Sequence, residues 1–311
     1  VLCKISVPLF FMIAGALLLK KDSSLKKIWS EKIVRMALAL FIFSVITYVG
    51  LGLHDPGRTM TVPDFIRKLY MERATYAYWY IYAYIALLMT LPFLRMIVKS
   101  MSENYYKYLI LLYLLFISVI PCLEYLLFQG DLVMYKKLRP EWILADTVFW
   151  PLLGYYLENV YDWKKCTVRT IWRWILLGVT GILLTCGMIY YMHGVTGVCT
   201  KEKSQDFHSA FILLPCIAIY MAMKYFWSGK AGQCVPARIK KIIVSLGSCT
   251  FGIYLLHMLI KEYFSGLWDV FRVSWHMNQM LAALLLCAVV FAAGYVLTLI
   301  LKQVPGLKRL L

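Results

Sequence analysis

Long uncharged apolar runs separated by short basic loops are the feature that most constrains this chain. Four runs are clean, at residues 74–94, 174–192, 242–260 and 273–301. Each is about as long as the ~20 residues that an α-helix needs to cross a bilayer core. Of the 311 residues, 62% are hydrophobic and 16% are charged, whereas soluble domains have roughly 45–50% and about 25%. The composition therefore excludes an ordinary soluble enzyme, a disordered chain and a fibrous repeat.

Five further runs have diffuse ends, a polar residue or a short length: 5–19, 36–53, 108–123, 142–157 and 207–223. Asp146 lies inside the fourth of them and His208 inside the last. A spanning segment must satisfy its own backbone hydrogen bonds, and runs of this length do so as helices. The sequence thus predicts an all-α polytopic transmembrane helix bundle with nine spans. It contains no internal repeat, low-complexity tract or GxxxG face.

Lysine and arginine are distributed unequally between alternate loops. One set of loops, together with the C-terminal tail, carries 18 of these residues, and the opposite set carries 10. The richer side of a membrane protein faces the cytoplasm. We therefore expect a protein of the cell's plasma (inner) membrane whose C-terminus lies in the cytoplasm. The formal net charge of +17 is then explained by topology and anionic lipid, not by nucleic acid.

This orientation places Val1 on the outer face, with no signal peptide before it. The chain also begins on Val almost at a membrane boundary. We therefore expect an upstream helix that would make ten spans, with both ends of the chain in the cytoplasm.

The sequence lacks the patterns of several other site types. Its nine cysteines form no CxxC pair, which argues against a disulfide framework or a zinc site. There is also no P-loop, GxSxG or HExxH. We accordingly expect no metal ligands.

Several short motifs together resemble the acyltransferase 3 family of integral membrane O-acyltransferases. The motifs occur in the family's order and extend over essentially the whole chain. They are VPLFFMIAG at 7–15, KIVR at 32–35, WYIY at 79–82 with LPFLR at 91–95, LGYYL at 153–157 and FGIYLLH at 251–257.

The resemblance implies a single membrane domain over residues 1–311 and a specific reaction. An acyl group, usually acetyl, would pass from cytoplasmic acyl-CoA to a hydroxyl of a cell-surface glycan or lipid-linked sugar. Acyl-CoA is then a substrate, and no bound cofactor is expected. Because a hydroxyl is a weak nucleophile at neutral pH, the reaction needs a base such as histidine.

The chain departs from the family pattern at three points. The family's histidine base lies on a helix that precedes the VPxFF stretch, and only six residues precede Val7 here. Ala14 replaces the usual serine before Gly15, and Lys32 replaces the first arginine of the RxxR pair. A lysine keeps the charge but not the bidentate geometry for phosphate.

Candidate donor-binding residues lie where an inner loop becomes a helix. Lys32 and Arg35 occupy this position and match the RxxR pair, so we expect them to contact acyl-CoA. The simpler interpretation is that both side chains extend to the lipid headgroups as anchors.

Candidate acceptor-binding residues are polar or aromatic groups near the outer ends of helices: Trp79, Glu124, Asp146 and Tyr254. Carboxylates can bind sugar hydroxyls, and an aromatic ring can stack on the sugar. We place Asp146 four residues inside the outer end of its helix. The alternative is that these residues are only interfacial.

His257 is the one candidate catalytic residue in the chain. It follows Tyr254 by one helical turn and lies about 24 Å above Lys241 at ~1.5 Å per residue. We expect it to orient the acceptor or hold a neighbouring helix, not to replace the family's base. Asp206 and His208 lie at another outer helix end.

Two other functions are compatible with the same pattern. A helix bundle with a basic inner vestibule and an acidic outer pocket could carry a small polar solute without chemistry. The chain could equally be an inactive, truncated member of the family.

The loop charges generate a topology prediction. A reporter fused after Leu311 should report a cytoplasmic location, and one inserted at Lys201 should report an external location. A tail found outside would reverse the orientation and with it the assignment of Lys32 and Arg35 to the donor side.

Overall fold

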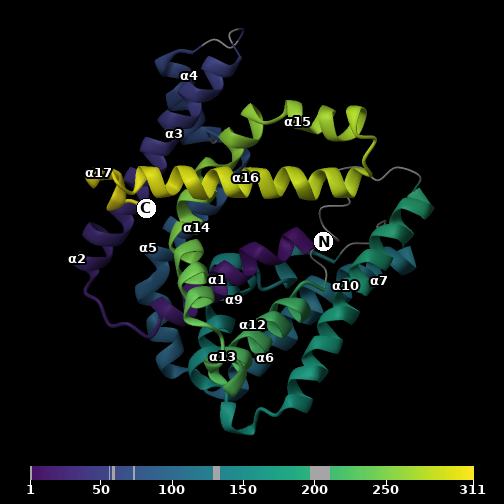
Figure 1. Ribbon diagram of the computed structural model, residues 1–311. Coiled ribbons are helices and arrows are strands. Elements are labelled where there is room, and N and C mark those ends of the chain that lie inside the picture. Colours follow the sequence, from purple (N-terminus) through teal and green to yellow (C-terminus); the bar gives the residue numbers. More distant parts are fainter. Residues whose placement is uncertain (1, 56, 58–59, 73, 129–133, 197–210) are drawn as a thin grey trace. The chain divides into compact units, whose positions relative to one another are not determined.

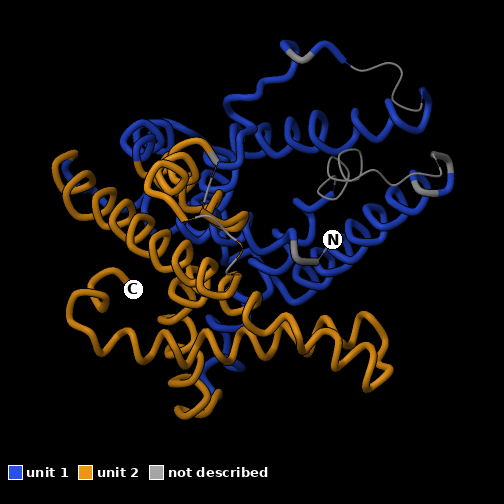
Figure 2. The backbone as a smooth tube through the Cα atoms, turned by 90° about the horizontal axis from the view of Figure 1, so that it is seen from above, with its two compact units in different colours: residues 1–24, 89–234 blue, residues 25–88, 235–311 orange. Residues whose placement is uncertain are grey.

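The computed structural model describes residues 2–55, 57, 60–72, 74–128, 134–196 and 211–311. These residues form helices joined by short connections, and the described part contains no strand. The chain divides into two compact units, Val1–Ser24 with Met89–Cys234 and Leu25–Leu88 with Val235–Leu311 (Figure 2). We call them unit 1 and unit 2.

Within the described part of the chain, six helical segments are long and apolar enough to cross a membrane, which confirms the predicted all-α, multi-pass class of membrane protein. They are Leu25–His54, Tyr76–Ser100, Glu103–Phe128, Val168–Met192, Ala237–Tyr263 and Gln279–Leu301.

Unit 1 begins with α1 and then resumes in the second part of α5 (Trp79–Ser100). Its helices are α1 (Ser6–Leu18), α6 (Glu103–Tyr113), α7 (Ile120–Phe128), α8 (Glu141–Leu144), α9 (Asp146–Tyr155), α10 (Val168–Thr196), α12 (Leu213–Ser228) and α13 (Lys230–Gln233). A π-helical turn, Leu114–Val119, joins α6 to α7, and another, Tyr156–Val160, continues α9.

Unit 2 contains two stretches of the chain, which include the first part of α5. Its other helices are α2 (Leu25–Lys27), α3 (Val34–His54), α4 (Val62–Arg67), α14 (Ala237–Tyr263), α15 (Gly266–Asp269), α16 (Gln279–Leu301) and α17 (Pro305–Lys308) (Figure 1). A π-helical turn, Ile28–Ile33, joins α2 to α3.

Glycines make the contact between α1 and α9 in unit 1. A Cβ atom added at Gly15 would overlap the backbone of Pro151, and one added at Gly154 would overlap the backbone of Met12. The two helices therefore meet backbone to backbone at both points. Interfaces between helices in a membrane are enriched in small residues, which let the backbones approach closely. Gly15 and Gly154 belong to two of the family-like motifs.

A third motif glycine makes the contact between α14 and α16 in unit 2. A Cβ at Gly252 would overlap the side chain of Thr298, which is itself fully buried. The Thr298 hydroxyl donates 2.7 Å to the carbonyl oxygen of Gly294 one turn earlier. The Thr298 hydroxyl is thus satisfied within its own helix, and both branches of the Thr298 side chain lie against Gly252.

Two predicted spans have different boundaries in the structure. Residues 142–157 are not continuous, because Ala145 is extended (ψ 141°) and separates α8 from α9. Asp146 is therefore the first residue of α9, which corrects its predicted place four residues inside a helix. An acidic residue in the first turn is favourable because it faces the positive end of the helix dipole.

The predicted span 273–301 begins later than expected, at Gln279. The Asn278 side chain accepts a hydrogen bond from the Met280 amide at 2.8 Å and caps α16. Before it, His276 has φ 48°, a left-handed conformation that interrupts a helix.

The predicted spans 5–19 and 207–223 correspond to shorter helices. They are α1, with 13 residues, and α12, with 16 residues. At about 1.5 Å per residue, α1 is some 20 Å long. Residues 207–210 of the predicted run 207–223, with His208 and also Asp206, lie outside the described residues. The count of nine spans stays a prediction.

Arg95, the arginine of the LPFLR motif, caps the end of α1. Its side chain is 6% exposed. Nε and Nη2 donate to the Leu18 carbonyl at 3.2 and 2.9 Å, and Nη1 donates to the Ser23 hydroxyl at 2.9 Å. A cation at a helix C-terminus is stabilised by the free carbonyls and the helix dipole.

The glycine contact predicts a matched pair of substitutions. Gly154→Ala should lower the free energy of unfolding by about 1–3 kcal/mol, because the new methyl group must displace backbone. Gly187→Ala in α10, where a Cβ meets nothing within 4 Å, should be neutral or stabilising by up to ~1 kcal/mol. Thermal unfolding in detergent measures both, and equal effects would contradict the packing argument.

Candidate functional site

The hydroxyl of Tyr78 is the centre of a buried polar cluster in unit 2. The Tyr78 side chain is fully buried and precedes the first turn of α5. Its hydroxyl lies 2.9 Å from the Thr47 hydroxyl of α3 and donates to the carbonyl oxygen of Leu255 in α14 at 2.8 Å. One phenol oxygen thus joins three segments of the chain.

Tyr254 completes a reciprocal connection between α14 and the turn before α5. Its hydroxyl donates to the carbonyl oxygen of Ala77, while the hydroxyl of Tyr78 donates to Leu255. Ala77 and Tyr78 before α5 are therefore bonded to Tyr254 and Leu255 of α14. Each side supplies one hydroxyl donor and one carbonyl acceptor. This pairing fixes the start of α5, where Trp79 lies, against one face of α14.

Aromatic rings connect Trp79 with His257. The Trp79 ring meets Tyr80 edge to face at 6.4 Å between centroids, and Tyr80 meets Tyr254 edge to face at 5.6 Å. Tyr254 is in turn 5.6 Å from the His257 ring. The structure thus brings together three predicted site residues, Trp79, Tyr254 and His257.

The imidazole of His257 is held through one nitrogen. Nδ1 lies 2.6 Å from the carbonyl oxygen of Tyr254. Since a carbonyl can only accept, the hydrogen bond requires the proton on Nδ1. In the neutral ring the lone pair is then on Nε2, which can accept a hydrogen bond or a proton from a hydroxyl.

Arg35 is also in unit 2, in the first turn of α3, and Lys32 lies in the π-helical turn before it. The Arg35 side chain is exposed, and its Nη2 donates 3.3 Å to the carbonyl oxygen of Leu310. Arg35 therefore lies beside the C-terminal tail.

The two predicted acceptor carboxylates belong to unit 1 and are engaged within it. Glu124 Oε1 accepts from the backbone amide of Met134 at 2.6 Å, and Asp146 Oδ1 accepts from Trp150 Nε1 at 2.9 Å. Each carboxylate orders a nearby segment. Their role in binding an acceptor stays a prediction.

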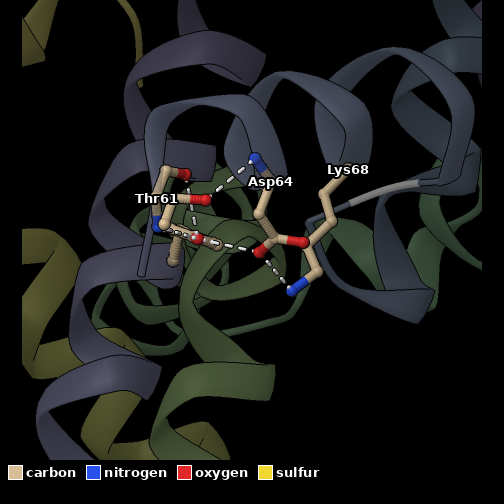
Figure 3. A network of polar contacts seen from close by, with 4 residues as sticks. Thr61, Asp64 and Lys68 are labelled. Carbon is tan, nitrogen blue, oxygen red and sulfur yellow. Dashed lines mark hydrogen bonds and ion pairs between the residues drawn. The ribbon is translucent and has the colours of Figure 1, made fainter. Parts of the chain in front are cut away.

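A second polar network in unit 2 holds α4 against α3. Asp64 Oδ2 accepts from the Tyr48 hydroxyl and from Lys68 Nζ, both at 2.8 Å, and the Asp64 amide donates to the Thr61 hydroxyl at 3.3 Å (Figure 3). Phe65 packs on the Tyr48 ring at 5.3 Å. Because these groups pair with one another, the network serves to dock α4.

Sequence reasoning missed Tyr78, Thr47 and Tyr80. Their only signal was their proximity to WYIY and to a polar position in an otherwise apolar helix. No sequence pattern predicts that a tyrosine bonds to a carbonyl 177 residues away. Among the described residues, no group of three His, Cys, Asp or Glu side chains could hold a metal ion.

Comparison with known families identifies the class of protein. The acyltransferase 3 model, described as an acyltransferase domain, matches residues 1–299. The match runs through both units, so the chain belongs to this family and is in general terms a membrane acyltransferase. No curated protein and no solved structure matches the chain.

The Tyr78 cluster generates a stability prediction. Tyr78→Phe should lower the free energy of unfolding by about 1–3 kcal/mol, because the Leu255 carbonyl and the Thr47 hydroxyl lose a buried partner. Tyr70→Phe is the matched control, since Tyr70 is 89% exposed, and should change stability by less than about 0.5 kcal/mol. A Tyr78→Phe variant as stable as its control would contradict the bonding scheme.

Proposed function

We propose that this protein transfers an acyl group, acetyl in the simplest case, from cytoplasmic acyl-CoA to a hydroxyl of a cell-surface glycan or lipid-linked sugar. Membership of the acyltransferase family supports the reaction class. The resemblance of the motifs to membrane O-acyltransferases supports the choice of donor and acceptor. The plasma membrane, with the C-terminus in the cytoplasm, is the location that the loop charges favour.

The observation that carries the proposal is the fixed orientation of His257. With Nδ1 tied to Tyr254, Nε2 can accept a hydrogen bond from a hydroxyl of the acceptor sugar that neighbours the reacting one. That bond holds the sugar so that the reacting hydroxyl, whose proton goes to the base, directs an oxygen lone pair toward the thioester carbonyl carbon. A C–O bond then forms, the C–S bond breaks, and CoA leaves as the thiol after receiving the proton. The family resemblance assigns proton removal to another histidine, so His257 has an orienting role.

The donor's phosphates suit Lys32 and Arg35. A guanidinium binds phosphate through two parallel hydrogen bonds, and an ammonium binds it as a point charge. Lys32 lies just before α3, and Arg35 lies in its first turn. The distribution of lysine and arginine between the loops favours the cytoplasmic side for this end of the helix. Acyl-CoA would therefore approach unit 2 from that side.

On the acceptor side, Trp79 offers a half-buried indole that could stack on a sugar ring. The Tyr254 hydroxyl donates to the Ala77 carbonyl, and its oxygen can still accept a hydrogen bond, so its contact with the acceptor stays a prediction. We propose that Tyr254 also positions Trp79 and His257. Glu124 and Asp146 remain candidates for hydrogen bonds to sugar hydroxyls.

The role of His257 can be tested by acyl transfer with the full-length protein. An orienting hydrogen bond is worth about 1 kcal/mol, so His257→Ala should lower kcat/KM roughly five- to ten-fold, mostly through the acceptor KM. Loss of a general base would cost about 10²–10⁴-fold in kcat. His257→Gln, which keeps a hydrogen-bonding group, should restore part of the activity.

A kcat loss of hundred-fold or more, with the KM unchanged, would make His257 the base and contradict its orienting role. No activity in the wild-type protein with any acyl-CoA would contradict the proposed function itself.

Donor binding can be tested separately. Arg35→Ala in the full-length protein should weaken acyl-CoA binding about ten-fold or more, because a charge-assisted contact is worth about 1.5–3 kcal/mol. Lys26→Ala, an exposed charge in α2, is the control and should have little effect. Equal, small effects in calorimetric titrations would leave Arg35 as a membrane anchor.

A further inference from the structure

Basic residues gather where the C-terminal tail meets the start of α3. Arg35 Nη2 donates to the Leu310 carbonyl at 3.3 Å. Arg309 and Lys308 lie one and two residues before that carbonyl, and both are exposed. Three cationic residues from opposite ends of unit 2 therefore lie in one region.

The tail that carries these residues is held in place. The Lys308 amide donates to the Val304 carbonyl at 2.9 Å and the Leu310 amide donates to Leu307 at 3.0 Å, so the end of the chain is a closed turn. The Leu310 side chain is 9% exposed. Leu311 packs against the core that contains Leu40 and Phe43. The charges are thus presented by an ordered segment.

α3 and the segment 270–311, which supply these charges, contain no acidic residue; Glu31, one turn before Arg35, lies 3.8 Å from Lys27. No acidic residue occurs between residues 32 and 54, nor between 270 and 311. Like charges in one region repel each other, and a bound anion removes that repulsion. Arg35 also has donors to spare, since a guanidinium carries five N–H groups and its hydrogen bond to the Leu310 carbonyl uses one of them.

We propose that Arg35, Lys308 and Arg309 form a phosphate-binding site that takes the CoA part of the donor. This proposal rests on the proposed function and extends it, because it makes the C-terminal tail part of the donor site. CoA carries a diphosphate and a 3′-phosphate, and a ligand with several phosphates needs several cations. Anionic lipid headgroups offer the same phosphate chemistry, so the test must separate the two sources.

The test uses the full-length protein in nanodiscs of pure phosphatidylcholine and in discs that also contain phosphatidylglycerol. The double variant Lys308→Gln/Arg309→Gln is compared with Arg238→Gln/Lys241→Gln. The control removes two exposed charges at the start of α14, in the same unit. CoA and dephospho-CoA, which lacks the 3′-phosphate, are the probes, and thermal unfolding checks that each variant is folded.

We expect the tail variant to raise the Kd for CoA about ten-fold in phosphatidylcholine discs. It should raise the Kd for dephospho-CoA by less, and the control should change neither. If the double variant unfolds, the two single substitutions should each give a smaller loss of the same kind.

Three results would overturn the proposal. Unchanged CoA affinity in the tail variant, with weaker binding in Arg35→Ala, would remove the tail from the site and leave the proposed function intact. Tighter CoA binding would mean that the tail blocks the site. If the tail variant binds CoA like the wild type in phosphatidylcholine discs, and differs only because phosphatidylglycerol no longer competes with CoA, the site binds lipid headgroups. Failure of the wild-type protein to bind CoA would instead reject the proposed function.

Discussion

The Tyr78 hydroxyl and the groups it bonds hold together the part of unit 2 on which the candidate site depends. In an apolar setting a polar atom without a partner costs about 1–3 kcal/mol, so buried hydroxyls determine which segments can lie together. Tyr78 satisfies Thr47 of α3 and Leu255 of α14, and Tyr254 returns a bond to Ala77. Trp79 directly follows Tyr78, and His257 lies two residues after Leu255. Their relative position is a consequence of this pairing.

The motif residues that indicated the family have mechanical roles in the structure. Gly15 and Gly154 allow α1 and α9 to touch through their backbones, and Gly252 leaves room on α14 for the side chain of Thr298. Arg95 caps α1 with two of its nitrogen atoms and binds Ser23 with the third. These contacts account for why each position needs that residue type. They also separate the residues that build the scaffold from those, such as His257, that keep an unused polar atom.

Charge is organised on a different principle from packing. The long helices are held by apolar contacts and backbone hydrogen bonds, whereas lysine and arginine collect at helix ends and in the tail. Arg35 illustrates the distinction, because its side chain is exposed and its guanidinium donates to the backbone carbonyl of Leu310. A cation placed in this way remains able to bind a phosphate, unlike Arg95, whose guanidinium is consumed by α1 and Ser23.

The sequence by itself determined the membrane class, the helical secondary structure and the family, because apolar length and ordered motifs are local properties of the chain. It also predicted Trp79, Tyr254, His257, Lys32 and Arg35 as candidates. It did not predict the break at Ala145 or the late start of α16 at Gln279, since both depend on caps and single backbone angles. Only the tertiary structure decided that Tyr254 bonds to Ala77, that isolated glycines replace a GxxxG face, and that the tail meets Arg35. Those contacts join residues far apart in the chain. A local sequence pattern does not predict which distant carbonyl or glycine a given side chain or helix will contact.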